Sequence, residues 1–340
     1  MQVPKTTEAV LLPAYNKNLI RAMLSLKTAE VELPQPAGNQ LVVKMEASPC
    51  NPSDIAFMQG TYNIVKELPA VPGFEGAGTV VATGEECRHM EGKRVSVFLQ
   101  EEKIGCWSQF IIVDADNCIV LDSKIDLLQA ATLSINPLTA LGMFEVAEKR
   151  GSDTIILDAA GGQVPQFVRV MAAKNGMEVI NIFRKRSSIQ GLEFSGTYVN
   201  LFTEDEDFEK RLAEACQGKK NVTALDAVGG IFSGTLFNAL PENSHLVVYG
   251  GLSNEAVGNI DTIDLIFNNK SIRGFNLNHY VADLKKNKDF DRVTKRLMQM
   301  VIDGEIKTRI NATFDIHDVV KGLRTYIKNM SAGKVVFLFD

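Results

Sequence analysis

The chain has 340 residues, which is enough for two domains with separate cores, and its content of 45% hydrophobic and 23% charged residues is ordinary for a globular protein. The net charge of −5 is spread along the chain without a basic block, so we expect neither a nucleic-acid nor a membrane-surface partner. No segment approaches the roughly 20 apolar residues that a membrane span needs.

The N-terminal segment lacks the charged-then-apolar pattern of a signal peptide and runs directly into a strand-like stretch at 8–12. The five cysteines are odd in number and form no CxxC motif, which is typical of free thiols in a reducing compartment. Together these features predict a cytoplasmic protein.

Residues 1 to about 120 predict a mostly β domain. Strand-like segments, separated by Gly, Pro and Asn, lie at 40–47, 76–84, 93–99 and 107–114. This spacing is typical of a Greek-key or barrel arrangement.

The pattern changes near Ile125, where two helical stretches follow that are separated by Asn136-Pro137. Strand and helix then alternate, first with the apolar strand at 153–159, a helix from Pro165 to Asn175 and a second strand at 177–183. This alternation predicts an α/β domain with a doubly wound parallel sheet of the Rossmann type.

The last part of the chain returns to a different pattern. An amphipathic helix begins near Asp283, and a strand, a second helix over 317–330 and the closing strand "KVVFLF" follow. We expect this segment to rejoin the first domain. The predicted domains are therefore 1–123 with 283–340, and 124–282.

The stretch "DAAGGQVPQF", residues 158–167, lies between a predicted strand and a predicted helix, as a dinucleotide-binding loop does. It keeps Gly162, the glycine that lets the backbone approach a pyrophosphate, but has Pro165 where the third glycine is expected. The amides of Gly162, Gln163 and Val164 precede the proline and can still point at an anion. An ordinary turn between strand and helix would show the same residues, so the loop alone leaves both possibilities open.

A basic run follows the second strand of this α/β unit. An NAD-specific fold usually ends that strand in an acidic residue, which holds the ribose 2′-hydroxyl. Here the run is Arg184, Lys185 and Arg186, and guanidinium groups suit a 2′-phosphate. The position of the run favours NADP(H), although a solvated charge run on a surface loop remains an alternative.

Several motifs together resemble one family, the medium-chain dehydrogenase/reductases, and within it the zinc-independent quinone reductase and 2-enoyl thioester reductase branch. The resemblance is carried by "EASPCNPSDIAFMQGTY" (46–62), "LPAVPGFEGAGTVVATG" (68–84), "AATLSINPLTAL" (130–141), "LDAVGG" (225–230), "LVVYGGLS" (246–253), "IRGFNL" (272–277) and "GKVVF" (333–337). It implies a GroES-like, mostly β catalytic domain with an inserted Rossmann domain, and an active-site cleft between the two.

The same comparison argues against zinc. A catalytic zinc needs three protein ligands, and in zinc-dependent relatives a cysteine and a histidine stand where this chain has Asn51 and Phe74. The structural four-cysteine lobe of those relatives is missing, and the four histidines show no paired spacing. We expect no metal ion.

The resemblance to enoyl thioester reductases places their catalytic tyrosine at Tyr62, and it implies that Asn51 and Thr139 orient substrate and nicotinamide. A phenol stays protonated at neutral pH, so Tyr62 can donate a hydrogen bond to an enolate oxygen or a proton to carbon. Alternatively, Tyr62 packs on residues 57–58 as an ordinary loop tyrosine. The residues expected to bind the cofactor are Thr139, Gly161, Gly162, Gln163, Val164, Arg184, Lys185, Arg186, Tyr249, Gly250, Gly251, Phe275, Leu277 and Lys334.

These features predict an NADPH-dependent reductase that transfers hydride to a small-molecule substrate. The sequence leaves open whether that substrate is an enoyl thioester, another α,β-unsaturated carbonyl compound or a quinone. The alternative is a catalytically silent nucleotide-binding homologue, which Pro165 favours. The resemblance further suggests a homodimer formed through the last Rossmann strand, 271–277, whose apolar edge would otherwise be exposed.

Overall fold

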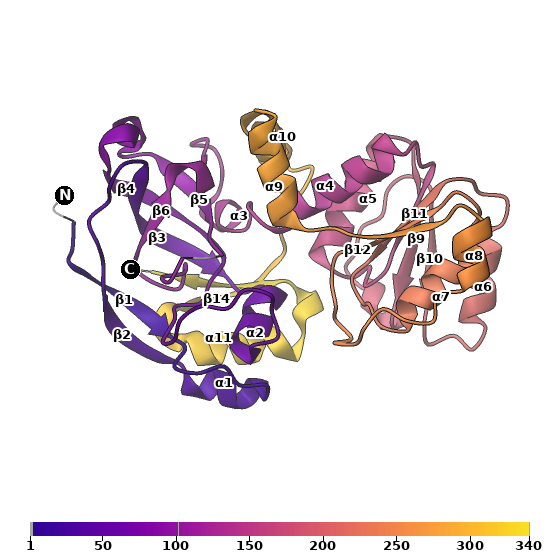
Figure 1. Cartoon of the computed structure of the whole chain (residues 1–340), viewed down its shortest axis with the longest axis horizontal. Coiled ribbons are helices and arrows are strands. Elements are labelled where there is room, and N and C mark those ends of the chain that lie inside the picture. The colour runs from indigo at the N-terminus through magenta and orange to yellow at the C-terminus, as the bar shows by residue number, and fades with distance from the viewer. Residues whose placement is uncertain (1–2, 101, 340) are drawn as a thin grey trace. The chain divides into compact units, whose positions relative to one another are not determined.

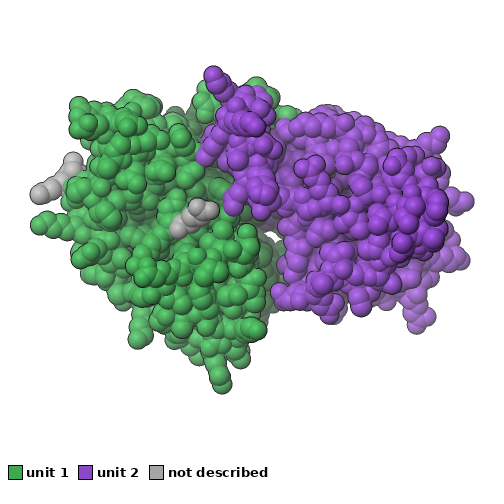
Figure 2. Space-filling model, viewed as in Figure 1, with its two compact units in different colours: residues 1–136, 291–340 green, residues 137–290 purple. Residues whose placement is uncertain are grey.

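The computed structural model describes residues 3–100 and 102–339, which form two compact units (Figure 2). Unit 1 comprises Met1–Asn136 and Asp291–Asp340, and unit 2 comprises Pro137–Phe290. Unit 2 is therefore an insertion within unit 1. The sequence predicted domain boundaries at 123/124 and 282/283, and each lies before the corresponding boundary of the structure, which follows Asn136 or Phe290.

Within the described residues, unit 1 is built on a seven-stranded, mostly antiparallel sheet (Figure 1). Its strands in spatial order are β14 (Ile310–Asp315), β15 (Lys334–Leu338), β3 (Gln40–Pro49), β4 (Glu75–Thr83), β5 (Arg94–Phe98) and β7 (Cys118–Val120), while β6 (Phe110–Asp114) pairs with β3. A separate antiparallel pair is formed by β1 (Thr6–Leu11) and β2 (Lys27–Glu32). Because β15 pairs with β3, the C-terminal segment completes the sheet of unit 1.

Helices cover this sheet and close a core rich in aromatic residues. The helices of unit 1 are α1 (Leu19–Ser25), α2 (Pro52–Gln59), α3 (Leu127–Ala131), α10 (Phe290–Ile302, whose first residue belongs to unit 2) and α11 (Val319–Lys328). Phe57 of α2, Phe74 before β4 and Leu323 of α11 are fully buried in one cluster. Trp107 and Phe337 meet edge to face in the same cluster, with ring centroids 5.1 Å apart.

Six parallel strands form the sheet of unit 2 in the part of the chain that the structure describes. Their spatial order is β10 (Tyr198–Phe202), β9 (Glu178–Phe183), β8 (Thr154–Leu157), β11 (Val222–Asp226), β12 (His245–Val248) and β13 (Ser271–Gly274). In chain order this is 3-2-1-4-5-6, the doubly wound arrangement that the sequence predicted. The order reverses between β8 and β11, and in such sheets ligands bind at the carboxyl ends of the strands beside this switch point.

The helices of unit 2 are α4 (Asn136–Lys149, whose first residue belongs to unit 1), α5 (Gln163–Lys174), α6 (Phe208–Cys216), α7 (Phe232–Ala239), α8 (Thr262–Phe267) and α9 (Leu277–Lys286). Every residue of the central strands β8 and β11 is buried, as expected for strands covered on both faces. By contrast, β13 lies at the edge of the sheet and is half-buried to exposed. None of the described helices combines the length and the apolar character that crossing a membrane requires.

Candidate active site and cofactor site

Tyr62 lies in the loop after α2 and is half-buried. Its ring packs at a tilt on the Phe74 ring, 5.5 Å between centroids, and its hydroxyl oxygen is 3.5 Å from Nε2 of Gln100. Burial raises the pKa of Tyr62 above its ordinary value of 10, so the phenol is a proton donor at neutral pH. The packing on Phe74 fits an ordinary loop tyrosine as well, so the catalytic role of Tyr62 stays a prediction.

Asn51 stands at the N-terminus of α2 with both ends of its amide engaged. Its Nδ2 donates to Oε1 of Glu75 over 2.9 Å, and the ammonium of Lys334 donates to its Oδ1. Its backbone N–H donates to the carboxylate of Asp54 over 2.7 Å, which caps the helix. Because a donor and an acceptor fix opposite ends of the amide, its orientation is determined by its neighbours.

The carboxyl groups of this network also connect α2 to other parts of unit 1. Oδ1 of Asp54 accepts the Phe74 N–H over 3.1 Å, and Oε2 of Glu75 accepts the Ile135 N–H over 3.0 Å. Glu75 thereby links Asn51 to the segment between α3 and α4. Neither Glu75 nor Asp54 was predicted from the sequence to be a functional residue. Each was considered only as part of a longer motif that carries the family resemblance.

Burial dominates the electrostatics here. It raises the pKa of Glu75 to about 7 and that of Asp54 to about 6, although Lys334 opposes both shifts. Burial also lowers the pKa of Lys334, and Glu75 is the strongest group opposing that change. The carboxyl of Glu75 therefore changes charge near neutral pH, next to an amide whose orientation it helps to fix.

Lys66 is a second buried cation of unit 1, and no motif in the sequence pointed to it. The residue is only 6% exposed, and its Nζ lies 5.6 Å and 5.5 Å from the ring centroids of Phe57 and Phe74. Among the described residues, Nζ has no hydrogen-bond partner, and burial lowers the pKa of Lys66. The Tyr15 hydroxyl donates to the Lys66 carbonyl over 2.9 Å and accepts its N–H over 2.8 Å, which fixes the backbone.

In unit 2, the glycine loop connects β8 to α5. Gly162 is the N-cap of α5, and the helix begins at Gln163, two residues before the start expected from the sequence. Pro165 is thus the third residue of the helix, within the first turn, where amides have no partner inside the helix. The amides of Gln163 and Val164 remain at the N-terminus, where an anion binds favourably.

The three basic residues after β9 differ in their contacts. The Arg186 guanidinium binds both oxygens of Asp205, at 2.9 and 2.8 Å, and lies 4.5 Å from the centroid of the Phe202 ring. Arg184 and Lys185 are exposed, and within the described chain no side chain pairs with either. Arg184 and Lys185 are therefore the cations most available to a phosphate.

The remaining expected cofactor residues follow the strands or lie on α4. Tyr249, Gly250 and Gly251 come directly after β12, at the carboxyl edge of the sheet. Phe275 follows β13, and its ring packs against Gly142 of α4. The two are so close that a Cβ at Gly142 would lie 2.7 Å from the ring. Thr139 is one turn before Gly142 on the same helix, and Leu277 begins α9. Unit 2 therefore gathers its expected cofactor residues near α4 and the carboxyl edge, while Tyr62, Asn51 and Lys334 belong to unit 1.

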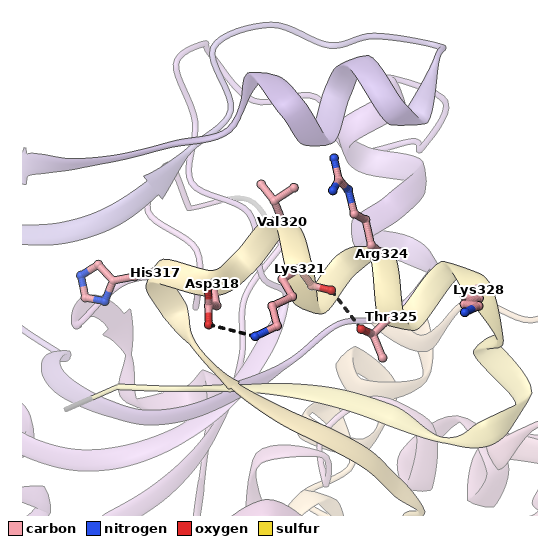
Figure 3. Close-up of a pocket in the computed structure, with 7 residues that line it drawn as sticks. All are labelled: His317, Asp318, Val320, Lys321, Arg324, Thr325 and Lys328. Carbon is pink, nitrogen blue, oxygen red and sulfur yellow. Dashed lines mark hydrogen bonds and ion pairs between the residues drawn. The ribbon is translucent and has the colours of Figure 1, made fainter.

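A surface pocket of about 510 Å³ lies along α11 (Figure 3). Its lining residues are His317, Asp318, Val320, Lys321, Arg324, Thr325 and Lys328. None of them was expected from the sequence to bind substrate or cofactor. The described residues also contain no group of three or more His, Cys, Asp or Glu side chains placed to hold a metal ion.

Comparisons with known proteins agree with this architecture. Residues 37–123 match the model of the alcohol dehydrogenase GroES-like domain. The mitochondrial enoyl-[acyl-carrier-protein] reductase of Caenorhabditis elegans is 31% identical over 290 residues, which cover 84% of this chain and 82% of the relative. A Mesorhizobium loti protein assigned as an NADPH:quinone reductase has a similar structure, with a TM-score of 0.91 at 27% identity over 100% of both chains. Etr1p, solved with NADP and crotonyl-CoA, shares the fold, with a TM-score of 0.79 at 24% identity over 98% of this chain and 100% of its own.

Proposed function

Because the chain belongs to the quinone reductase and enoyl thioester reductase branch of the medium-chain dehydrogenase/reductases, and is thus an oxidoreductase, we propose that it reduces an activated C=C bond with NADPH. The substrate class is a 2-enoyl thioester or another α,β-unsaturated carbonyl compound, and a quinone is the alternative acceptor. The observation that carries the proposal is the half-buried phenol of Tyr62, whose pKa, already far above neutral for an ordinary tyrosine, is raised further by burial, so that the hydroxyl can donate.

Unit 2 has the features that NADP(H) requires. The N-terminus of α5 offers the amides of Gln163 and Val164 for a pyrophosphate, and Arg184 and Lys185 offer cations for a 2′-phosphate. The solved complex of Etr1p contains NADP, and the Mesorhizobium loti relative is described as using NADPH, which supports the same cofactor here. When bound, NADPH supplies the hydride.

The residues of unit 1 have separate proposed roles in this reaction. As hydride reaches the β carbon, negative charge develops on the carbonyl oxygen of the substrate and on the α carbon. Tyr62 donates a hydrogen bond to that oxygen or a proton to the carbon. Asn51 orients the substrate, and Glu75 and Lys334 hold the side-chain amide of Asn51 in one orientation. Such a site suits a substrate whose own carbonyl accepts the charge.

A second candidate function is nucleotide binding without turnover. Pro165 favours it, since this residue removes one amide from the first turn of α5, next to the expected phosphate site. A fluorescence titration with NADPH and NADH, followed by turnover assays with a crotonyl thioester, an enal and a quinone, separates the two functions. Tight NADPH binding with no turnover of any substrate would favour the silent homologue, whereas reduction of the thioester would support the enzyme.

The proposed assembly is a homodimer formed through the edge of the sheet of unit 2. Helix α8, which precedes the edge strand β13 in the chain, exposes Ile263, Ile266 and Phe267, the last with 71% of its surface accessible. Exposed apolar residues gathered on one helix are typical of an interface. The cytoplasmic location stays a prediction, and the printed name of the Caenorhabditis elegans relative places that protein in mitochondria.

A further inference from the structure

Two aspartates end neighbouring strands at the switch point of unit 2. Asp158 directly follows β8, Asp226 is the last residue of β11, and both are 0% exposed. Asp226 accepts hydrogen bonds from the N–H groups of Val228 and Gly229, at 2.9 and 2.8 Å, and from the Ser233 hydroxyl at 2.5 Å. Its carboxyl group is therefore surrounded by donors.

Asp158 has a different set of contacts. It accepts the Ala227 N–H at Oδ1 over 2.7 Å and the Val228 N–H at Oδ2 over 3.1 Å. Burial and Asp226 together raise the pKa of Asp158 well above its ordinary value. The Tyr249 phenol also faces the pair, and burial and both aspartates raise its pKa.

The contacts of Asp158 join two loops that diverge. Backbone bonds from Leu252 to Ala227 (3.0 Å) and from Ser253 to Val228 (2.9 Å) tie the loop after β12 to the loop after β11. The loop after β11 is tied to the end of β8 by the Asp158 side chain. At a switch point the two central strands continue in opposite directions, which separates the backbones of their loops. Because those backbones diverge, a side chain such as that of Asp158 is needed to join the end of β8 to the loop after β11.

The residue after Asp158 is the first of the glycine loop and has an unusual backbone. Ala159 has φ of 40°, in the left-handed region that residues other than glycine seldom adopt. Such a conformation costs energy and persists where neighbouring contacts hold it. The anchored carboxyl of Asp158 provides such contacts immediately before Ala159.

We propose that Asp158 is a positioning residue of the nucleotide site, whose carboxyl group holds the loop after β11 against the start of the glycine loop. The inference rests on the proposed function, because it takes unit 2 to bind NADPH. The carboxyl performs this role because its two oxygens accept from Ala227 and Val228, the first residues of the loop after β11.

Asp158→Asn keeps one of the two acceptors, because its Oδ1 can accept from Ala227 while its Nδ2 replaces the oxygen that accepts from Val228. The experiment is a fluorescence titration with NADPH at neutral pH on the wild type, Asp158→Asn, Asp158→Ala and the control Asp153→Asn. Asp153 is an exposed acid just before β8, so this control removes the same charge away from the pair.

We expect Asp158→Ala to lose about tenfold in affinity for NADPH, with an unchanged circular dichroism spectrum. Asp158→Asn should lose less than Asp158→Ala because it keeps one acceptor, and Asp153→Asn should follow the wild type. Equal affinities of the wild type and Asp158→Ala would overturn the positioning role. A folded wild type that binds no NADPH would instead overturn the proposed function.

Discussion

The side-chain amide of Asn51 donates to the carboxylate of Glu75 across 2.9 Å, although 24 residues separate the two in sequence. Glu75 has a pKa raised to about 7 from an ordinary 4.5, so the folded chain holds a proton there that the unfolded chain has lost. The free energy of unfolding contributed by this group is therefore fully present below about pH 4.5 and falls as pH rises through about 7.

Glu75→Gln should reduce this pH dependence. The variant has no proton to release, so the fall in unfolding free energy between pH 5 and pH 8, measured by urea denaturation, should become shallower. It should not vanish, because burial also raises the pKa of Asp54, to about 6. At every pH the variant should lose about 1–3 kcal/mol, since one end of the glutamine amide places a donor against a donor. The exposed Glu67→Gln should keep the wild-type slope, and an unchanged slope in Glu75→Gln would contradict the assignment.

Tyr62→Phe should lower kcat on an enoyl substrate by about 10–1000-fold, because the ring is kept and only the hydrogen-bond donor is lost. NADPH affinity and melting temperature should change little, since the Phe74 contact remains. Tyr198→Phe, which removes a hydroxyl from a tyrosine of unit 2 with 43% of its surface exposed, is the matched control. Full kcat in Tyr62→Phe would show that the residue only packs, while quinone reduction could survive the change.

Arg184→Ala combined with Lys185→Ala should weaken NADPH binding by at least about tenfold and leave NADH binding nearly unchanged. Arg186→Ala should have a smaller effect, because its guanidinium already binds Asp205. Lys210→Ala, an exposed cation paired with Glu214 on α6, is the control. The preference for NADPH should also weaken with added salt. Equal wild-type affinity for the two cofactors would refute the assignment.

Pro165→Gly should change NADPH affinity by no more than about tenfold, because the amides of Gln163 and Val164 precede the ring. Pro165→Ala restores the same N–H with a better helix former, and it separates the effect of the amide from that of helix stability. A larger gain in affinity for both variants would mean that the proline blocks the phosphate site, which would favour the silent homologue.

Phe267→Asp should convert the proposed homodimer to a monomer, since it places a charge in the exposed apolar surface of α8. Sedimentation at micromolar concentration measures the change. Ile20→Asp introduces the same charge at an apolar position of unit 1 that is 59% exposed, and it should leave the proposed dimer intact. A wild type that sediments as a monomer would disprove the interface.

The parallel sheet of unit 2 was predictable because its strands are mostly apolar and alternate with helices. The predicted start of α5, at Pro165, was two residues too late. Proline suits the first helical position, but it is tolerated throughout the first turn, where no amide is bonded within the helix. The run Arg184, Lys185 and Arg186 looks uniform in sequence. Only the fold brings Asp205 to Arg186 and leaves the other two cations unpaired among the described residues.

The surroundings of the expected catalytic residues were hidden for a related reason. Asn51 was selected, but its two partners lie far from it in the chain and carry no local signal. Lys66 stands among loop residues, where a lysine is normally solvated, and its burial between Phe57 and Phe74 depends on how the loop folds back on α2. Buried charges of this kind come from tertiary packing, which hydrophobic periodicity does not report.

The insertion of unit 2 into unit 1 has a consequence for biosynthesis. Lys334 and Asn51 are 283 positions apart, and β15 reaches its place beside β3 only after the whole of unit 2 has been translated. Since segments nearer the N-terminus fold first during synthesis, the fold of unit 2 is complete while Asn51 still lacks its cation. Premature termination in the last few dozen codons would therefore leave unit 2 whole but remove Lys334 and β15, and with them the contact that holds the Asn51 amide and the strand that completes the sheet of unit 1.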